Sequence, residues 1–96
     1  MAKGYLIYHV EVRDPELYQQ YIAADAEAFR KHGGRFLVRG GKNEILEGRS
    51  HARHVVIEFD SYQAALAYYR CPEYVAATAI RNAAADAEVV LVEGVD

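Results

Sequence analysis

GGRFLVRGGKNEILEG, residues 33–48, is the stretch around which the chain is organised. Its first glycine pair can end a helix in the left-handed conformation, and Arg35–Arg39 then alternates as a β-strand does. Strict alternation puts Arg35 and Arg39 on one face of that strand. A planar guanidinium held on a rigid strand is suited to binding a carboxylate, a phosphate or an enolate. The stretch therefore predicts a strand that carries an anion-binding site.

The residues before this stretch predict one strand and one long helix. Residues 5–12 alternate, with Leu6, Tyr8, Val10 and Val12 on the apolar face. Asp14 followed by Pro15 is typical of a helix start, because the aspartate can cap the first turn and proline is tolerated there. Apolar residues then recur every three or four positions as far as Phe29, which indicates an amphipathic helix that ends before the first glycine pair.

The residues after it predict a second strand–helix–strand set. A proline at position 72 interrupts the helical pattern, so the crossover is expected as two helical pieces. The expected elements are a short extended segment at Asn43–Leu46, a strand at Arg53–Phe59, a helix capped by Ser61 that runs to about Arg70, a second helical piece to about Ala85, and a last strand at Ala87–Val95.

This order of elements predicts an α+β fold of the ferredoxin-like, split βαβ type, formed as a single domain over residues 1–96. Its four-stranded antiparallel sheet has helices on one face, and right-handed crossovers place the first and third strands in the middle. The other face would be half apolar and half ionisable, with Tyr5, Ile7, His9, Glu11, Arg35, Leu37, Arg39, His54, Val56 and Glu58 on it. Such a face predicts a homodimer in which it packs against a second copy.

Composition limits the classes of partner. The 96 residues carry a formal net charge of −3, so the positive field that dominates nucleic-acid binding is missing. No apolar run is long enough to cross a bilayer, and the N-terminal residues lack the layout of a signal peptide. Cys71 is the single cysteine, which excludes an intrachain disulfide. We therefore expect a cytoplasmic protein that binds neither nucleic acid nor membrane.

Several segments resemble the bacterial family called domain of unknown function 1330. They are GGRFLVRGG at residues 33–41, LEG at 46–48, VVIEF at 55–59, AALAYY at 64–69, PEY at 72–74 and VLVEG at 90–94. The resemblance implies a ferredoxin-like protomer that pairs face to face as a dimeric α/β barrel. That superfamily includes cofactor-independent monooxygenases, lactone isomerases and some haem enzymes, whereas the family itself has no settled activity. This sequence departs from the expected pattern at Tyr68, where tryptophan is common, and at Cys71, where serine is common.

The first candidate site lies on the uncovered sheet face. Arg39 with Arg35 would bind an anion or stabilise an oxyanion, while His9 or Glu58 would transfer a proton near neutral pH. The catalytic residues predicted here are His9, Arg39 and Glu58. The alternative interpretation is a lattice of ion pairs that satisfies charges buried in a dimer and performs no chemistry.

The second candidate group lies along the interrupted crossover helix. Tyr68, Tyr69, Tyr74 and Arg81 could orient a small oxygenated ligand through their phenol hydroxyls and one guanidinium. The alternative interpretation is ordinary packing of aromatic rings between helices and sheet.

No cofactor or metal is expected from the sequence. His51 and His54 are three residues apart in an extended segment, which places them on opposite faces, and no cysteine or carboxylate pattern completes a zinc set. Two functions stay open. One is a cofactor-independent enzyme of monooxygenase or isomerase type, acting on an anionic or oxygenated small molecule. The other is a non-catalytic binding or structural dimer whose charged residues lock the interface.

Overall fold

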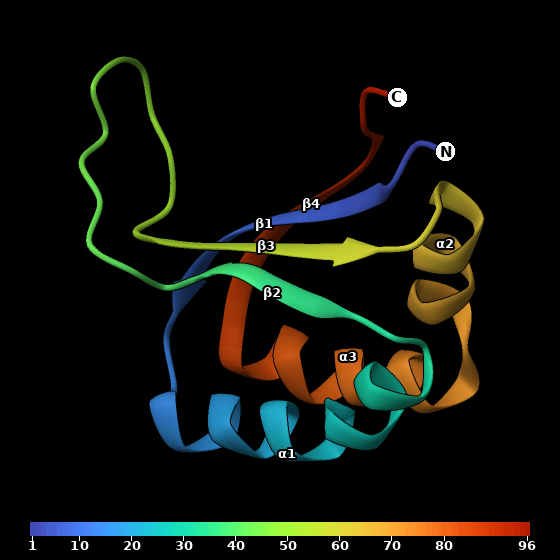
Figure 1. Cartoon of the computed structure of the whole chain (residues 1–96). Helices are drawn as coiled ribbons and strands as arrows, with labels where there is room; N and C mark the ends of the chain where they lie inside the picture. Colours follow the sequence, from blue (N-terminus) through green and yellow to red (C-terminus); the bar gives the residue numbers. More distant parts are fainter.

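The computed structural model describes all 96 residues and contains one four-stranded antiparallel sheet with three helices (Figure 1). The elements are β1 (Gly4–Val12), α1 (Pro15–Lys31), β2 (Arg35–Arg39), β3 (Arg53–Phe59), α2 (Tyr62–Arg70), α3 (Pro72–Ala84) and β4 (Ala85–Glu93). The strand order is β2-β3-β1-β4, so the first and third strands are central, as predicted. The ferredoxin-like α+β fold expected from the sequence is confirmed.

Side chains cap each helix at its first turn. Asp14 accepts a hydrogen bond from a backbone N–H of α1 at 3.1 Å, and Ser61 does the same for α2 at 3.0 Å. The Cys71 sulfur accepts a hydrogen bond from the Tyr74 N–H of α3 at 3.4 Å. Cysteine therefore fills the cap position for which serine was expected, and the helix break at Pro72 forms as predicted.

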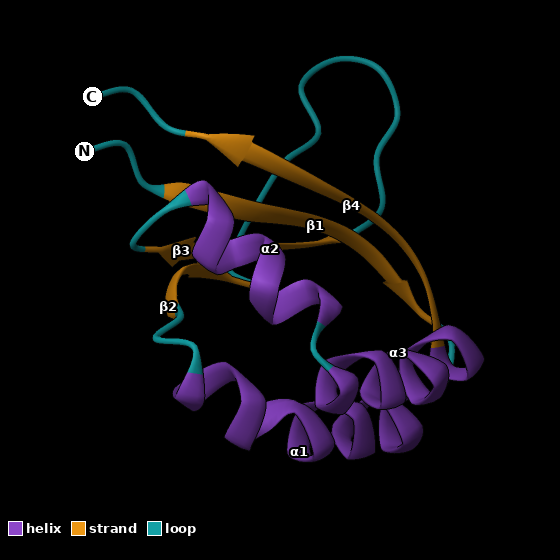
Figure 2. Cartoon of the chain, turned by 90° about the vertical axis from the view of Figure 1, so that its right-hand side faces the viewer, coloured by secondary structure: helices purple, strands orange, loops and turns teal.

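All three helices lie on the same side of the sheet (Figure 2). The core is a cluster of 16 buried hydrophobic residues between these two layers. The apolar faces of β1 and β3 are the ones predicted, and they contribute Leu6, Tyr8, Val10, Val55, Ile57 and Phe59. None of the helices has the length and apolar character that crossing a bilayer requires.

A β-bulge in β2 changes which way its last residues face. Arg35 pairs with Glu58 and Phe36 with Ile57, but the register then shifts so that Arg39 pairs with Val55. Because one extra residue reverses the alternation, Arg39 lies on the helix side of the sheet while Arg35 lies on the uncovered side. The prediction that the two arginines share a face is wrong.

Two boundaries also differ from the sequence-based expectation. Residues 40–52 form one long exposed loop that projects beyond the sheet in Figure 1, and Asn43–Leu46 is not a strand within it. The Asn43 amide holds this loop by donating to the carbonyls of Gly41 at 3.0 Å and Ala52 at 3.1 Å. The last strand begins at Ala85, directly after α3, because that residue already adopts an extended conformation.

Candidate functional site

On the uncovered sheet face the charged residues bind one another. Arg35 Nε donates to Glu58 Oε1 at 3.0 Å and Arg35 Nη2 donates to Asp60 Oδ1 at 3.1 Å. The Tyr5 hydroxyl donates to the second Glu58 oxygen at 3.0 Å. The hydrogen bond from Arg35 lowers the pKa of Glu58, and the hydrogen bond from Tyr5 lowers it further. Glu58 is therefore held as an ionised partner in an ion-pair network, which makes it a poor proton acceptor.

The predicted trio of His9, Arg39 and Glu58 does not come together within the protomer. His9 Nδ1 lies 2.8 Å from His54 Nδ1 on the uncovered face, so one ring donates and the other must accept. Arg39 lies on the opposite face of the sheet because of the β2 bulge. The sequence alternation placed Arg39 correctly within a strand, but it could not reveal the extra residue that reverses its direction.

The predicted tyrosine group is mostly core. Tyr68 and Tyr74 have no exposed surface and Arg81 keeps 5%. The Tyr74 hydroxyl lies 2.8 Å from the hydroxyls of Tyr8 and Tyr21, and Arg81 Nη1 donates to it at 2.8 Å. We call Tyr8, Tyr21, Tyr74 and Arg81 the hydroxyl cluster. The three hydroxyls and Arg81 Nη1 are bonded to one another, which matches the packing interpretation of this group, whereas Arg81 Nε is buried without a partner.

Tyr69, the remaining member of that predicted group, is partly buried and packs against Tyr74, with the two ring centroids 5.2 Å apart. It lines a groove between α2 and β4, together with Leu6, Tyr62, Leu66, Arg70, Val89 and Leu91. The four residues predicted to orient one ligand therefore do not surround a common space.

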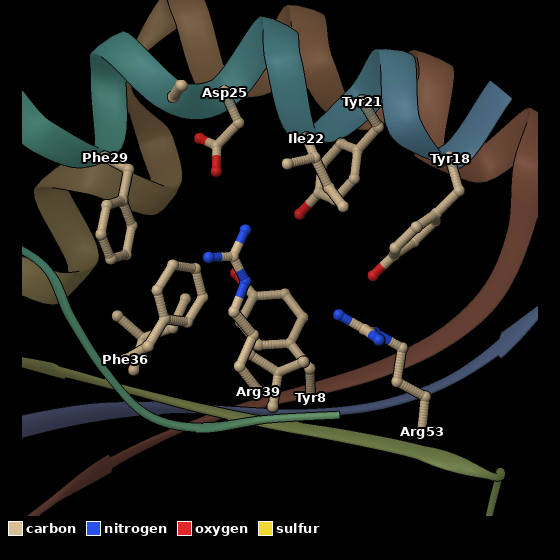
Figure 3. A pocket seen from close by; sticks show the side chains of 12 residues that line it. Tyr8, Tyr18, Tyr21, Ile22, Asp25, Phe29, Phe36, Arg39 and Arg53 are labelled. Atoms are coloured by element: carbon tan, nitrogen blue, oxygen red, sulfur yellow. The ribbon is translucent and has the colours of Figure 1, made fainter. Parts of the chain in front are cut away.

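A cavity of about 250 Å³ lies between α1 and the helix side of β1, β2 and β3 (Figure 3). We call it the α1–sheet cavity. Its walls are mainly aromatic and aliphatic, and three charged side chains enter it. The lining residues are Tyr8, Tyr18, Tyr21, Ile22, Asp25, Ala26, Phe29, Phe36, Arg39, Arg53, Val55 and Ile57. An apolar cavity with a few polar groups that converge on it is the usual form of a small-molecule site.

Asp25 is the only carboxylate that lines the cavity. It projects from α1 toward the sheet in Figure 3, and both of its oxygens lie 2.7 Å from the Tyr68 hydroxyl. Burial raises the pKa of Asp25, although the hydrogen bond from Tyr68 and the positive charge of Arg81 partly oppose that effect. Its carboxyl group is thus a stronger base when ionised than an exposed aspartate.

Two guanidinium groups face the cavity without a carboxylate partner. The Arg39 guanidinium carbon lies 4.2 Å from the centre of the Phe36 ring, and that of Arg53 lies 5.7 Å from the centre of the Tyr18 ring. Neither arginine is among the residues that form salt bridges in this structure. Arg39 is exposed, so the cavity opens to solvent beside it. The cavity therefore has uncompensated positive charge near its mouth.

Two of these charged residues interrupt apolar patterns in the sequence. Asp25 occupies the stripe of α1 that also carries Tyr18, Tyr21 and Phe29. Arg53 is in phase with Val55 and with the rest of the apolar face of β3. A charge on an otherwise apolar stripe is the sequence signal that identifies both residues.

A family model described as Domain of unknown function (DUF1330) matches residues 3–95. No curated protein matches this sequence.

Solved structures with the same fold have low sequence identity to this chain. A protein of unknown function from Rhodopseudomonas palustris is 23% identical, with a TM-score of 0.79 over 99% of this chain and 84% of that one. SnoaB, a cofactor-independent oxygenase from Streptomyces nogalater, is 16% identical, with a TM-score of 0.68 over 100% of this chain and 96% of that one. A dimeric ferredoxin-like protein of unknown function from Thermobifida fusca is 21% identical, with a TM-score of 0.60 over 95% and 90% of the two chains. At these identities the likeness shows the fold alone.

Proposed function

The chain belongs to the domain of unknown function 1330 family, and from its geometry we propose that it is a small-molecule enzyme whose active site is the α1–sheet cavity. In this proposal Asp25 accepts a proton from an oxygenated substrate, and Arg39 stabilises the anion that forms. These roles replace those that the sequence suggested for His9 and Glu58, which face the other side of the sheet.

The position and the raised pKa of Asp25 carry the proposal. A general base works best when its pKa lies near the working pH and its carboxylate lies within reach of the acidic hydrogen. Asp25 points into the cavity, and burial moves its pKa upward. Its hydrogen bond to Tyr68, a residue of α2, fixes the direction of the carboxylate.

Arg39 supports the second half of the reaction. It enters from β2, whereas Asp25 enters from α1, so the two side chains approach the cavity from opposite walls (Figure 3). Removal of a proton from a carbon beside a carbonyl moves negative charge to the carbonyl oxygen. A guanidinium with no other anionic partner can bind that oxygen, and the apolar lining strengthens the interaction. The proton ends on Asp25 and the electron pair ends on the enolate.

The shared fold with SnoaB adds an argument by analogy. SnoaB is described as a cofactor-independent oxygenase, and an enolate or phenolate is the electron-rich form of a substrate that such chemistry would need. The analogy agrees with the proposal, because Asp25 and Arg39 would form that species with no help from a bound cofactor.

We also propose that the active form is a homodimer joined through the uncovered sheet face. That face carries Val90, 50% exposed, and Val92, 41% exposed, beside the network of Arg35 and Glu58. A mixed surface of this kind is covered well by a second copy of itself, in which the ion pairs would set the register. The description of the Thermobifida fusca protein as dimeric supports this arrangement.

Exchange of substrate hydrogen in D₂O tests the proposed reaction. A panel of enolisable cyclic ketones and hydroxyaryl ketones is incubated with the protein, and the loss of the acidic C–H signal is followed by proton NMR. We expect catalysed exchange that falls by about 10²- to 10⁴-fold in Asp25→Asn, the usual contribution of a positioned base.

Glu27→Gln is the matched control, because Glu27 is an exposed carboxylate on the same helix. It should exchange the substrate at the wild-type rate. Exchange no faster than in buffer across the panel, or full activity in Asp25→Asn, would contradict the proposal.

A further inference from the structure

Arg53 is the charged cavity residue for which the proposed reaction has no use. It begins β3, pairs with Val10, and so faces the helices and not the solvent side of the sheet. Figure 3 shows its guanidinium directed into the cavity near Tyr18, away from Asp25. Arg39 and Arg53 therefore bring positive charge to two separate parts of one cavity.

The guanidinium group of Arg53 lacks hydrogen-bond and ion-pair partners within the protein. Its Nε is buried and has no hydrogen-bond partner, and its guanidinium forms no salt bridge. Buried polar groups in folded proteins are nearly always paired, and an unpaired buried N–H destabilises the native state. Figure 3 shows the end of the guanidinium directed into the cavity, so an acceptor inside the cavity can bind its terminal nitrogens.

The backbone around Arg53 holds the guanidinium in place. A Cβ atom built on Gly40 would collide with Arg53 Nη1, so the Arg53 side chain packs directly on the glycine backbone. Gly40 has a φ of +67°, and its N–H donates to the His54 carbonyl at 2.8 Å. The Tyr18 ring lies on another side of the group. A guanidinium positioned in this way loses little freedom when it binds a ligand.

We propose that Arg53 anchors the carboxylate of a monocyclic aromatic acid that is the substrate of the α1–sheet cavity. This inference rests on the proposed function, because it places the reacting end of the same substrate between Asp25 and Arg39. The ring of the substrate would lie among the aromatic walls, where Phe29 and Phe36 stack with their ring centroids 4.5 Å apart.

Charge and size favour this class of ligand. With Asp25 ionised, the cavity holds two positive side chains and one negative one, so a ligand with a single carboxylate brings it to neutrality. A carboxylate also matches the forked geometry of a guanidinium, which binds through two parallel N–H groups. The volume of about 250 Å³ lies just under the usual range for ligand pockets and fits one ring better than a fused system.

Binding of 4-hydroxybenzoate and 4-hydroxybenzamide, measured by isothermal titration calorimetry, tests the anchor. The two probes share a ring and a hydroxyl, and they differ in the charge of one group. We expect wild-type protein to bind the acid about 10- to 100-fold more tightly than the amide, as charge-assisted hydrogen bonds usually give. In Arg53→Gln the ratio should fall to about one, and Arg53→Lys should retain part of it.

Arg49→Gln is the control, because Arg49 is an exposed arginine of the 40–52 loop and does not line the cavity. It should preserve the wild-type ratio. Equal affinity for the two probes in the wild-type protein, absence of binding by either, or an unchanged ratio in Arg53→Gln would overturn the anchor. Equal affinity of the wild-type protein for the two probes would overturn the anchor even if Arg53→Gln does not fold, and Arg53→Lys then tests whether a preference depends on Arg53 and not on Arg39.

The binding assay separates this inference from the proposed reaction. Asp25→Asn should keep the preference for the acid, because the base does not contact the carboxylate in this arrangement. A preference that survives without any catalysed exchange would support the anchor and refute the reaction. Catalysed exchange of uncharged ketones, together with equal affinity of the wild-type protein for the acid and the amide, would support the reaction and refute the anchor.

Discussion

Replacing Tyr74 with phenylalanine removes one oxygen atom from the centre of the hydroxyl cluster. Three hydrogen bonds of 2.8 Å end on that oxygen, one of them from the Arg81 guanidinium. The bond from the charged group contributes about 1.5–3 kcal/mol and each phenol bond about 1 kcal/mol. Tyr74→Phe should therefore lower the free energy of unfolding by about 4 kcal/mol.

That loss is large for a chain of this length. At about 0.05–0.15 kcal/mol per residue, a domain of this size has a total stability of roughly 5–14 kcal/mol. Urea denaturation followed by circular dichroism should show the midpoint move down by roughly 2–4 M, given a denaturant slope of about 1–2 kcal/mol/M. The aromatic ring itself stays in place, so the change isolates the hydroxyl from the packing.

Tyr62→Phe removes the same atom from a tyrosine that is 36% exposed and has no side-chain hydrogen bond in the structure. Its effect should stay within about 0.5 kcal/mol, as for most surface substitutions. Equal stability of Tyr74→Phe and Tyr62→Phe would refute the reasoning, because it would mean that the buried cluster contributes nothing beyond ring packing.

Two further predictions concern pH and assembly. Because burial raises the pKa of Asp25 above its usual 3.8, the folded state holds that proton more strongly than the unfolded state. The stabilisation that comes from protonated Asp25 is complete below the unfolded-state pKa, and it is lost as the pH rises through the folded-state pKa. In urea titrations, Asp25→Asn should therefore gain stability relative to the wild-type protein as the pH rises from about 4 to 7. Sedimentation equilibrium at micromolar concentration should give twice the 10.8 kDa of one chain, and a single species of 10.8 kDa would contradict the proposed homodimer.

The fold could be read from the sequence because its local signals agree with one another. The alternation of apolar residues in β1 and β3 predicted which face of each strand is buried, and Asp14 and Ser61 predicted where two helices begin. Each of these signals depends on neighbours within a few residues, which a single sequence displays directly.

The candidate site was harder to predict because it depends on register and on contacts between distant elements. Alternation placed Arg39 beside Arg35, and only the pairing with β3 reveals the bulge that separates them. The sequence suggests that Tyr74 contacts a ligand. In the structure its hydroxyl lies against the hydroxyls of Tyr8 and Tyr21, which are 66 and 53 positions earlier in the chain. Asp25 was visible in the helix pattern, but its environment was not.

The bulge in β2 also affects the solubility of the protein, because β2 is an outer strand of the sheet. The free edge of such a strand presents unpaired N–H and C=O groups that can recruit a strand from another molecule and start aggregation. Here the edge is only five residues long, the bulge breaks its regular spacing, and an arginine stands at each end. The edge is also partly apolar, because Leu37 is 54% exposed. The bulge that turns Arg39 into the cavity therefore also protects this edge from pairing with other chains.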